Sequence, residues 1–362
     1  MRARLEDVCE RGSSNLRQAD VAGRSGDYPI YGASGYIGNV DFYHQELPYV
    51  AIVKDGAGIG RTVLLPAKSS VIGTMQYLLP KKNVLPEYLC YVVRYMHLEK
   101  YFSGATIPHI YFRDYKSEEF NLVPVDYQEE IVATLGKIEA IVAARQQQLQ
   151  KLDELVKARF IELFGDPLGN DKGWQKALIA EVCNAIFGGG TPSKSHPEYF
   201  AGSIPWVSPK DMKSSVINDS IDHITEEAIA HSTTNLVPAN SVLMVIRSGI
   251  LKHTLPVAVN SLPVTINQDM KAFVPNETVK TAFLLYFFKA IENDVLAGVR
   301  GVTADNIDFK AFQKRTIIVP PLALQEQFVA FVTQADKSKV AVQKALDEAQ
   351  LLFDSLMQKY FG

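Results

Sequence analysis

The chain has 362 residues, of which 47% are hydrophobic and 21% are charged, and its formal net charge is −3. This composition argues against wholesale disorder and against a surface coated with basic residues, so any nucleic-acid binding would depend on the local placement of charge. Because no apolar run approaches the ~18 residues that cross a bilayer, and the N-terminus lacks the apolar core of a signal peptide, we expect a cytoplasmic protein.

The first 125 residues predict a mixed α+β domain. Runs rich in β-branched and aromatic residues are broken by glycine and proline, as in "LPYVAIVKDGAGIGRTVLLP" at 47–66, a pattern typical of strands and turns. The segment "PEYLCYVVRYMHLEKYFSG" at 86–104 follows and predicts a helix.

Residues 128–165 predict one long helix with a hydrophobic stripe along one side. The segment contains no proline, and its apolar positions follow the alternating steps of four and three that characterise coiled coils. The predicted seam consists of Ile131, Leu135, Ile138, Val142, Arg145, Leu149, Leu152, Val156, Arg159 and Leu163.

The sequence of this helix is repeated by a segment of equal length at 325–362, which aligns without a gap at an offset of 197 residues. The matched pairs include Gln128 with Gln325, Val132 with Val329, Phe164 with Phe361 and, upstream of the helices, Gly104 with Gly301, Thr106 with Thr303, Ile110 with Ile307 and Phe112 with Phe309. The chain therefore repeats itself as globular unit, helix, globular unit, helix.

The second globular unit has the same character as the first, with strand-like runs such as "NSVLMVIRSGILKHTLPVAV" and a helical stretch at 281–298. We predict domains at 1–125 and 167–322, with a central helix at 126–166 and a C-terminal helix at 323–362. If the two helices pack on each other, the connectivity makes them antiparallel, and ~37 residues give a rod of ~55 Å. Two alternatives are that each helix packs on its own domain, or that the protein dimerises through them.

Several common enzyme motifs have no complete match in the sequence. In "DGAGIGR" the glycines stand at 56, 58 and 60, and Arg61 occupies the place where a GxGxxG loop needs glycine. No GxSxG, HExxH or methyltransferase motif is present. The three cysteines form no CxxC or Cys/His cluster, which argues against a disulfide scaffold or a zinc site. We expect no catalytic residue and no metal ligand in this chain.

Polar, glycine-rich loops with isolated cations remain as candidate binding elements. Glycine and Ser/Thr loops expose backbone N–H groups to phosphates, single cations add charge, and arginine reads guanine. The candidate DNA contacts are Ser34, Lys54 and Arg61 in the first unit and Thr191, Ser193, Lys194, Ser208, Lys210, Arg247, Ser248 and Lys252 in the second. For any one of these loops taken alone, composition favours an ordinary hairpin turn.

Taken together, these features resemble the specificity (S) subunit of type I restriction-modification systems. The likeness extends over essentially the whole chain. It is carried by "YPIYGASGYIG", "IVKDGAGIG", "SGATIPHI" followed by "VPVDYQEEIV", and "GGGTPS" with "IPWVSPKDM" and "VPPLALQEQFV".

The resemblance implies an α+β fold with two pseudo-repeated target-recognition domains joined by two long antiparallel coiled-coil helices. It also implies a non-catalytic subunit in which each domain reads one half of a bipartite double-stranded DNA target. The helical pair would set the spacer and dock two adenine-methyltransferase subunits. S-adenosylmethionine would bind those partners, and ATP and Mg²⁺ would bind the two restriction subunits of systems that have them.

Two other interpretations stay open at this point. A coiled-coil scaffold with protein- or glycan-binding end domains would show no DNA affinity and no methyltransferase partner. A fused enzyme is opposed by the missing motifs.

Overall fold

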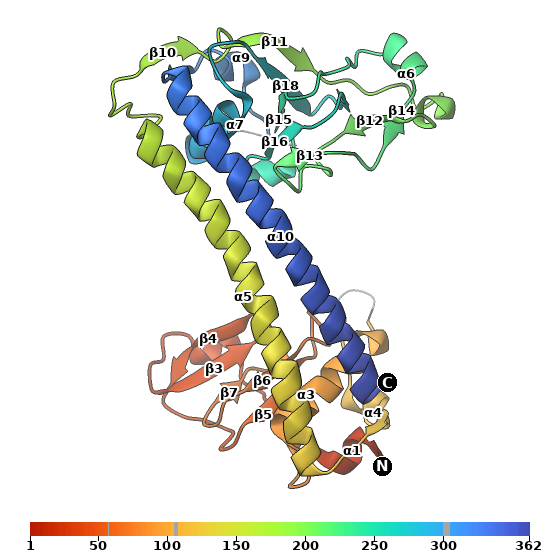
Figure 1. The fold of residues 1–362 in the computed structure, drawn as a ribbon. Coiled ribbons are helices and arrows are strands. Elements are labelled where there is room, and N and C mark those ends of the chain that lie inside the picture. Colours follow the sequence, from red (N-terminus) through yellow and green to blue (C-terminus); the bar gives the residue numbers. More distant parts are fainter. Residues whose placement is uncertain (57, 105–107, 300–304) are drawn as a thin grey trace. The chain divides into compact units, whose positions relative to one another are not determined.

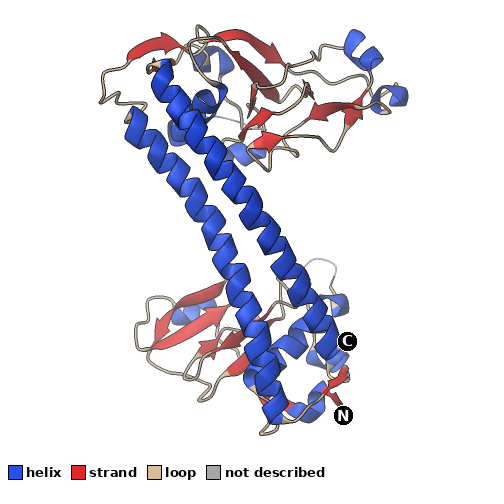
Figure 2. Ribbon diagram, viewed as in Figure 1, coloured by secondary structure: helices blue, strands red, loops and turns tan. Residues whose placement is uncertain are grey.

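The computed structural model describes residues 1–56, 58–104, 108–299 and 305–362, so the predicted repeat positions Thr106, Gly301 and Thr303 lie outside the described residues. The chain forms two compact units, drawn in Figure 1 and Figure 2. Unit 1 is Met1–Gln147 with Gln343–Gly362, and unit 2 is Gln148–Val342. Each unit contains one strand-rich domain and part of both long helices, so this division cuts the helices that the sequence treated as separate segments.

Unit 1 is built on a four-stranded antiparallel sheet with the order β2-β8-β5-β6 and a three-stranded sheet with the order β4-β3-β7. The strands are β1 (Arg2–Arg4), β2 (Cys9–Ser13), β3 (Tyr28–Gly32), β4 (Gly35–Val40), β5 (Tyr49–Val53), β6 (Thr62–Leu65), β7 (Ser70–Val71), β8 (Met75–Pro80) and β9 (Glu119–Asn121). The helices are α1 (Leu5–Val8), α2 (Gln18–Val21), α3 (Pro86–Tyr95), η1 (Leu98–Tyr101) and α4 (Phe112–Tyr115). All of β5 is buried, as its continuous apolar run requires.

Unit 2 repeats this plan with a five-stranded sheet, β11-β18-β15-β16-β13, and a three-stranded sheet, β14-β12-β17. The strands are β10 (Gln175–Leu178), β11 (Cys183–Gly188), β12 (Ile204–Val207), β13 (Val216–Ile217), β14 (His223–Ile224), β15 (Val242–Val245), β16 (Val257–Asn260), β17 (Thr265–Ile266), β18 (Met270–Pro275) and β19 (Thr316–Val319). The helices are η2 (Pro197–Phe200), α6 (Glu226–Ala230), η3 (Gly249–Lys252), α7 (Thr281–Ala290), α8 (Glu292–Ala297) and α9 (Phe309–Phe312).

The strand registers of the two units coincide. Val53 at the end of β5 lies opposite Met75 at the start of β8, and Val245 at the end of β15 lies opposite Met270 at the start of β18. In both units a parallel pairing, β3 with β7 or β12 with β17, joins the smaller sheet. Unit 2 adds β13, which pairs in parallel with β16 at the sheet edge. The repeat seen in the sequence is therefore a repeat of the strand framework.

The two predicted long helices are confirmed as α5 (Val125–Phe164) and α10 (Leu322–Phe361), each of 40 residues. Within each unit they lie side by side and run in opposite directions (Figure 1). In unit 1, Ile131, Leu135 and Ile138 share a core with Phe353, Met357 and Phe361. In unit 2, Val156, Phe160 and Phe164 share a core with Phe328, Val332 and Ala335. These residues occupy six pairs of equivalent positions, 197 residues apart, that are buried in both helices.

The buried stripe departs from the predicted seam at the C-terminal part of each helix. There it continues through Phe160 and Phe164, and through Met357 and Phe361, in successive steps of four. A helix that packs on a globular domain keeps its natural 3.6-residue turn, which drifts away from a strict seven-residue repeat. The α+β fold with two repeated domains and two long antiparallel helices is confirmed.

A buried glutamine joins the start of α5 to its domain. Gln128 is 0% exposed. Its Oε1 accepts a hydrogen bond from the backbone N–H of Leu85 at 2.9 Å. Its Nε2 donates to the carbonyl oxygens of Asn83 at 3.0 Å and Val123 at 2.8 Å. The side chain thereby satisfies the backbone groups where α3 begins and where the chain enters α5.

Gln325 makes the same connection at the start of α10 and is also 0% exposed. Its Oε1 accepts from the backbone N–H of Lys280 at 2.8 Å. Its Nε2 donates to the carbonyl oxygens of Thr278 at 3.0 Å and Pro320 at 2.8 Å. The sequence pairs the two glutamines, but only the structure reveals what they hold together.

Candidate nucleic-acid interface

Arg247 follows β15 and is held at the surface by Asp269, which precedes β18. Nε and Nη2 of Arg247 lie 2.6 and 2.5 Å from Oδ1 of Asp269. The ends of two neighbouring antiparallel strands meet here, which explains why residues 22 positions apart are in contact. The arginine side chain is 48% exposed and the aspartate 23%, so the guanidinium is the outer member of the pair.

Three more predicted residues lie beside this pair. Lys194, Ser208 and Lys210 line a cavity of about 660 Å³ whose wall also includes Asp269. Ser208 donates from Oγ to Oδ2 of Asp211 at 2.9 Å, which fixes the turn after β12. Asp269 thus links Arg247 to this lysine-lined cavity, and residues from four separate loops come together.

The remaining predicted residues of unit 2 lie around the same strand ends. The hydroxyl of Thr191 hydrogen-bonds to Gln268, and Ser193 Oγ lies 2.7 Å from Ser195 Oγ within its own loop. Ser248 caps η3, and Lys252 in η3 is 65% exposed, with its Nζ 3.9 Å from Asp305. Thr191 therefore joins the Arg247 neighbourhood, Ser193 and Ser248 serve local turns, and Lys252 lies opposite Asp305, a residue distant in sequence.

A second cavity, of about 840 Å³, lies on another side of Arg247, and we call it the β15 hollow. We define it by Arg247, Gln268, Lys271, Asn306, Asp308 and Lys310. Nζ of Lys271 lies 4.9 Å from the ring centre of Phe309, close enough for a cation–π contact. Three cations and one carboxylate give this hollow a positive balance.

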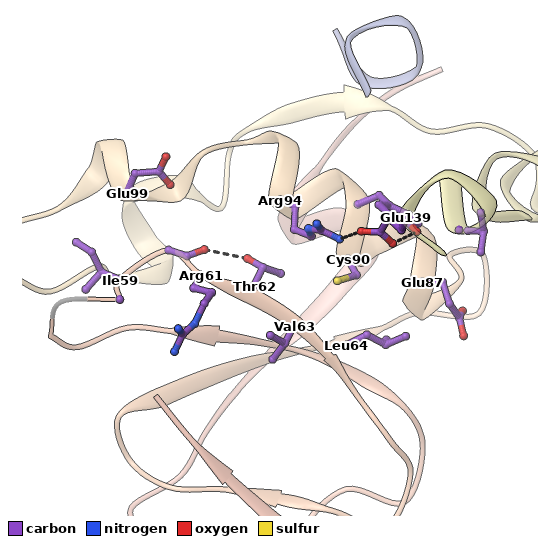
Figure 3. Close-up of a pocket in the computed structure, with 15 residues that line it drawn as sticks. Ile59, Arg61, Thr62, Val63, Leu64, Glu87, Cys90, Arg94, Glu99 and Glu139 are labelled. Carbon is purple, nitrogen blue, oxygen red and sulfur yellow. Dashed lines mark hydrogen bonds and ion pairs between the residues drawn. The ribbon is translucent and has the colours of Figure 1, made fainter. Parts of the chain in front are cut away.

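The predicted residues of unit 1 do not form one site. Ser34 lies in the exposed turn between β3 and β4. Lys54 follows β5 and lines a cavity of about 440 Å³. Arg61 precedes β6 and lines a different cavity of about 820 Å³ (Figure 3). The two loops from which these residues were predicted, 31–38 and 53–61, therefore present their polar side chains at three different places.

The cavity beside Lys54 is lined by four cationic side chains, and we call it the β5 hollow. We define it by Arg11, Lys54, Asp55, Tyr111, Arg113 and Lys116. Nδ1 of His109 donates to Oδ1 of Asp55 at 2.6 Å, and the guanidinium of Arg113 lies 4.6 Å from the ring centre of Tyr111. Lys116 is paired with Glu6 at 2.7 Å. This hollow also has a positive balance.

The cavity that includes Arg61 lies among β6, α3 and α5, and Glu139 pairs with two of its polar groups (Figure 3). Tyr91 donates from its hydroxyl to Oε2 of Glu139 at 2.6 Å, and Arg94 Nη1 donates to Oε1 at 2.6 Å. Burial, and then the bond to Glu139, raises the pKa of Tyr91. Burial raises the pKa of the Cys90 thiol to about 12, so this wall offers no thiolate nucleophile near neutral pH.

Sequence reasoning missed Asp55, His109, Asp269, Lys271 and Lys310. A signal was present for His109 and Lys310 alone, because they adjoin Ile110 and Phe309, which the repeat alignment already matched with Ile307 and Phe112. In the described parts of the chain, no group of three or more His, Cys, Asp or Glu residues could hold a metal ion. Nor does any helix described carry an apolar stretch that would span a bilayer.

Comparison with known proteins identifies the family. A model described as the type I restriction modification DNA specificity domain matches residues 1–154 and 171–349. The specificity subunit of the type I restriction enzyme EcoR124I/EcoR124II from Escherichia coli is 36% identical over 220 residues, which is 58% of this chain and 52% of that protein. The MjaIX specificity subunit from Methanocaldococcus jannaschii is 31% identical over 121 residues, 33% of this chain and 27% of that protein. The chain therefore matches about half, or less, of the length of these relatives.

Two solved structures share the fold over nearly the whole chain. The type I restriction-modification S subunit from M. genitalium has a TM-score of 0.62 at 14% identity and covers 100% of this chain and 96% of its own. A chain from a structural study of complex assembly and conformational transition of the type I R-M system has a TM-score of 0.56 at 18% identity, with coverage of 99% and 97%. At these identities the likeness shows the fold. With the family match over most of the sequence, the chain belongs to the type I restriction-modification DNA specificity domain family.

Proposed function

We propose that this chain is the non-catalytic DNA specificity subunit of a type I restriction-modification complex. Each strand-rich domain reads one half of a bipartite double-stranded DNA target. The observation that carries this proposal is the repeated strand framework, which in both units ends in a cation-lined hollow. Two readers in one chain fit a target with two halves, and local cation clusters supply the phosphate contacts that a net charge of −3 does not.

The long helices set the spacer between half-sites and dock two adenine-methyltransferase subunits. A continuous helix of 40 residues extends about 60 Å, which exceeds the ~34 Å of one turn of B-DNA. S-adenosylmethionine binds the methyltransferase subunits, which flip the target adenine into their own site. Two restriction subunits, where the system has them, bring ATP and Mg²⁺.

The test is a genome-wide map of N6-methyladenine in a host that expresses this chain with its cognate methyltransferase subunit. Hosts with the methyltransferase alone and with the chain alone are the controls. A new bipartite motif with a fixed gap, present only when both are expressed, is the expected result. A stable complex with an active methyltransferase and no new motif would refute the proposal.

A further inference from the structure

The β5 hollow and the β15 hollow occupy the same place in the repeated framework. In unit 1 the backbone N–H of Ile110 donates to the carbonyl oxygen of Lys54 at 3.0 Å, and the next residue, Asp55, forms a bridge with His109. These contacts attach the segment before α4 to the end of β5.

In unit 2 the same two contacts recur. The backbone N–H of Ile307 donates to the carbonyl oxygen of Ile246 at 2.9 Å, and the next residue, Arg247, forms a bridge with Asn306. The segment before α9 is thus attached to the end of β15. It follows that Arg247 is the counterpart of Asp55, and that Asn306 is the counterpart of His109.

Beside each hollow one basic side chain is held by one carboxylate, but the two pairs are arranged differently. Arg247 lines the β15 hollow, whereas in unit 1 the carboxylate, Asp55, lines the β5 hollow. In unit 2, Asp269 holds Arg247 through two nitrogens. In unit 1, Asp55 holds His109 through Nδ1. The basic member is the more exposed in both pairs, at 48% against 23% for Arg247 and at 38% against 29% for His109. The carboxylate therefore acts as an inner support and the basic side chain faces outward.

A supported basic side chain is suited to reading a base. The carboxylate fixes its direction before DNA arrives, which reduces the entropy lost on binding. Among the described residues, neither Nη1 of Arg247 nor Nε2 of His109 has a hydrogen-bond partner. Around each pair stand further cations suited to phosphates, Lys271 and Lys310 in unit 2 and Arg113 in unit 1.

We propose that Arg247 and His109 are the corresponding base-reading residues of the two recognition domains, supported by Asp269 and Asp55. Arg247 contacts a guanine, whose O6 and N7 match its free donors. His109 contacts one base pair of the other half-site through Nε2. The inference rests on the proposed function and adds to it which residues specify which half. It also places the reading residue of unit 1 at a position that the loop composition did not suggest.

The test uses the purified complex of the full chain with its methyltransferase subunit. Methylation rates are measured on duplexes that each carry one changed base pair of the mapped target. Arg247→Ala is expected to reduce discrimination by about 5- to 150-fold at one base pair of one half-site. His109→Ala is expected to act on one base pair of the other half-site. Arg247→Lys should also weaken this discrimination, because the flexible lysine ammonium lacks the planar fork that lets arginine bond Asp269 with one edge and face the guanine with the other.

Asp269→Asn and Asp55→Asn act as positioning variants, and each should weaken discrimination at the same base pair as its partner. Arg315→Ala and His97→Ala remove an arginine and a histidine outside both hollows and should leave every ratio unchanged. Complex formation is checked by size-exclusion chromatography. Should His109→Ala fail to assemble, His109→Gln keeps a polar side chain and should also relax one base pair.

Two results would overturn the inference. One is unchanged discrimination in the Arg247 and His109 variants. The other is a uniform fall in rate on all duplexes, which would assign these side chains to phosphate contacts. Failure of the proposed function is a separate result, since it would appear as a wild-type complex with no bipartite target.

Discussion

Replacing Gln325 with alanine tests the idea that a buried amide fastens each long helix to its domain. The change removes a side chain that is 0% exposed and leaves the N–H of Lys280 and the carbonyls of Thr278 and Pro320 without that partner. Each unsatisfied buried group costs about 1–3 kcal/mol. Since water partly fills the space left by the side chain, we expect unit 2 to lose about 3–5 kcal/mol of unfolding free energy.

The two tryptophans, Trp174 and Trp206, both lie in unit 2, so their fluorescence during urea unfolding reports on the unit that contains Lys280 and Gln325. Gln334→Ala is the matched control, because Gln334 is an exposed glutamine in the same helix and the same unit. That variant should change stability by less than about 0.5 kcal/mol. If the two variants unfold at the same urea concentration, the buried amide contributes no more to stability than a surface glutamine does.

Three further predictions concern other polar or reactive groups. Glu139→Ala should lower the stability of unit 1 by about 1 kcal/mol, because Tyr91 and Arg94 lose a shared acceptor at a half-exposed site. Thermal unfolding measures this change, and Glu154→Ala, which removes an exposed acceptor, is the control. Equal melting temperatures for the two variants would contradict the prediction. Burial, and then repulsion from Lys339, lowers the pKa of Lys289. The unfolded chain therefore binds that proton more tightly, and stability rises with pH between the lowered value and the ordinary lysine pKa. Lys289→Met should remove this rise, and the control Lys337→Met, which changes an exposed lysine, should keep it. If the unfolding free energies of wild type and Lys289→Met change with pH in parallel, the prediction is wrong. Finally, burial raises the pKa values of Cys9, Cys90 and Cys183 to about 12. At pH 8 the thiols of the native chain should therefore not react with a disulfide reagent within minutes, whereas all three should react in urea. A thiol that reacts within minutes in the native chain would contradict the prediction.

The fold could be predicted because the sequence contains an internal repeat, so that the long helix of one half has a counterpart in the other. The ungapped offset of 197 identified the two helices and matched their six buried pairs before any contact was known. The end of the seam could not be predicted, because a heptad assumes that the helix packs on another helix. Phe361 packs against the ring of Tyr88 in α3, with ring centres 5.4 Å apart. Phe164 packs against Phe283 in α7 at 4.9 Å as well as against Phe328 in α10 at 5.6 Å.

The candidate site could be predicted only in part. Loop composition identified Arg247, Lys194 and Lys210, since an isolated cation in a glycine-rich turn is a local feature. Asp269 could not be found this way, because it joins the site through the pairing of β15 with β18. His109 was missed for the same reason, and its partner Asp55 lies 54 residues away. Pairs made by strand registry are invisible to a search that considers one loop at a time.

A comparison between the two units separates structural polar groups from reading groups. Where the chain holds itself together, the units agree, as in the bonds of Gln128 and Gln325. The cation over a tyrosine ring also recurs, as Arg94 over Tyr91 in unit 1 and Lys289 over Tyr286 in unit 2.

At the ends of β5 and β15 the backbone contacts agree and the side chains do not. Aspartate stands in one unit where arginine stands in the other, and across the bridge histidine stands in one unit where asparagine stands in the other. A difference in chemistry on an unchanged frame is what two readers of unlike half-sites require. For that reason the hollows, more than the exposed loop tips around them, are where we expect the two halves of the target to be distinguished.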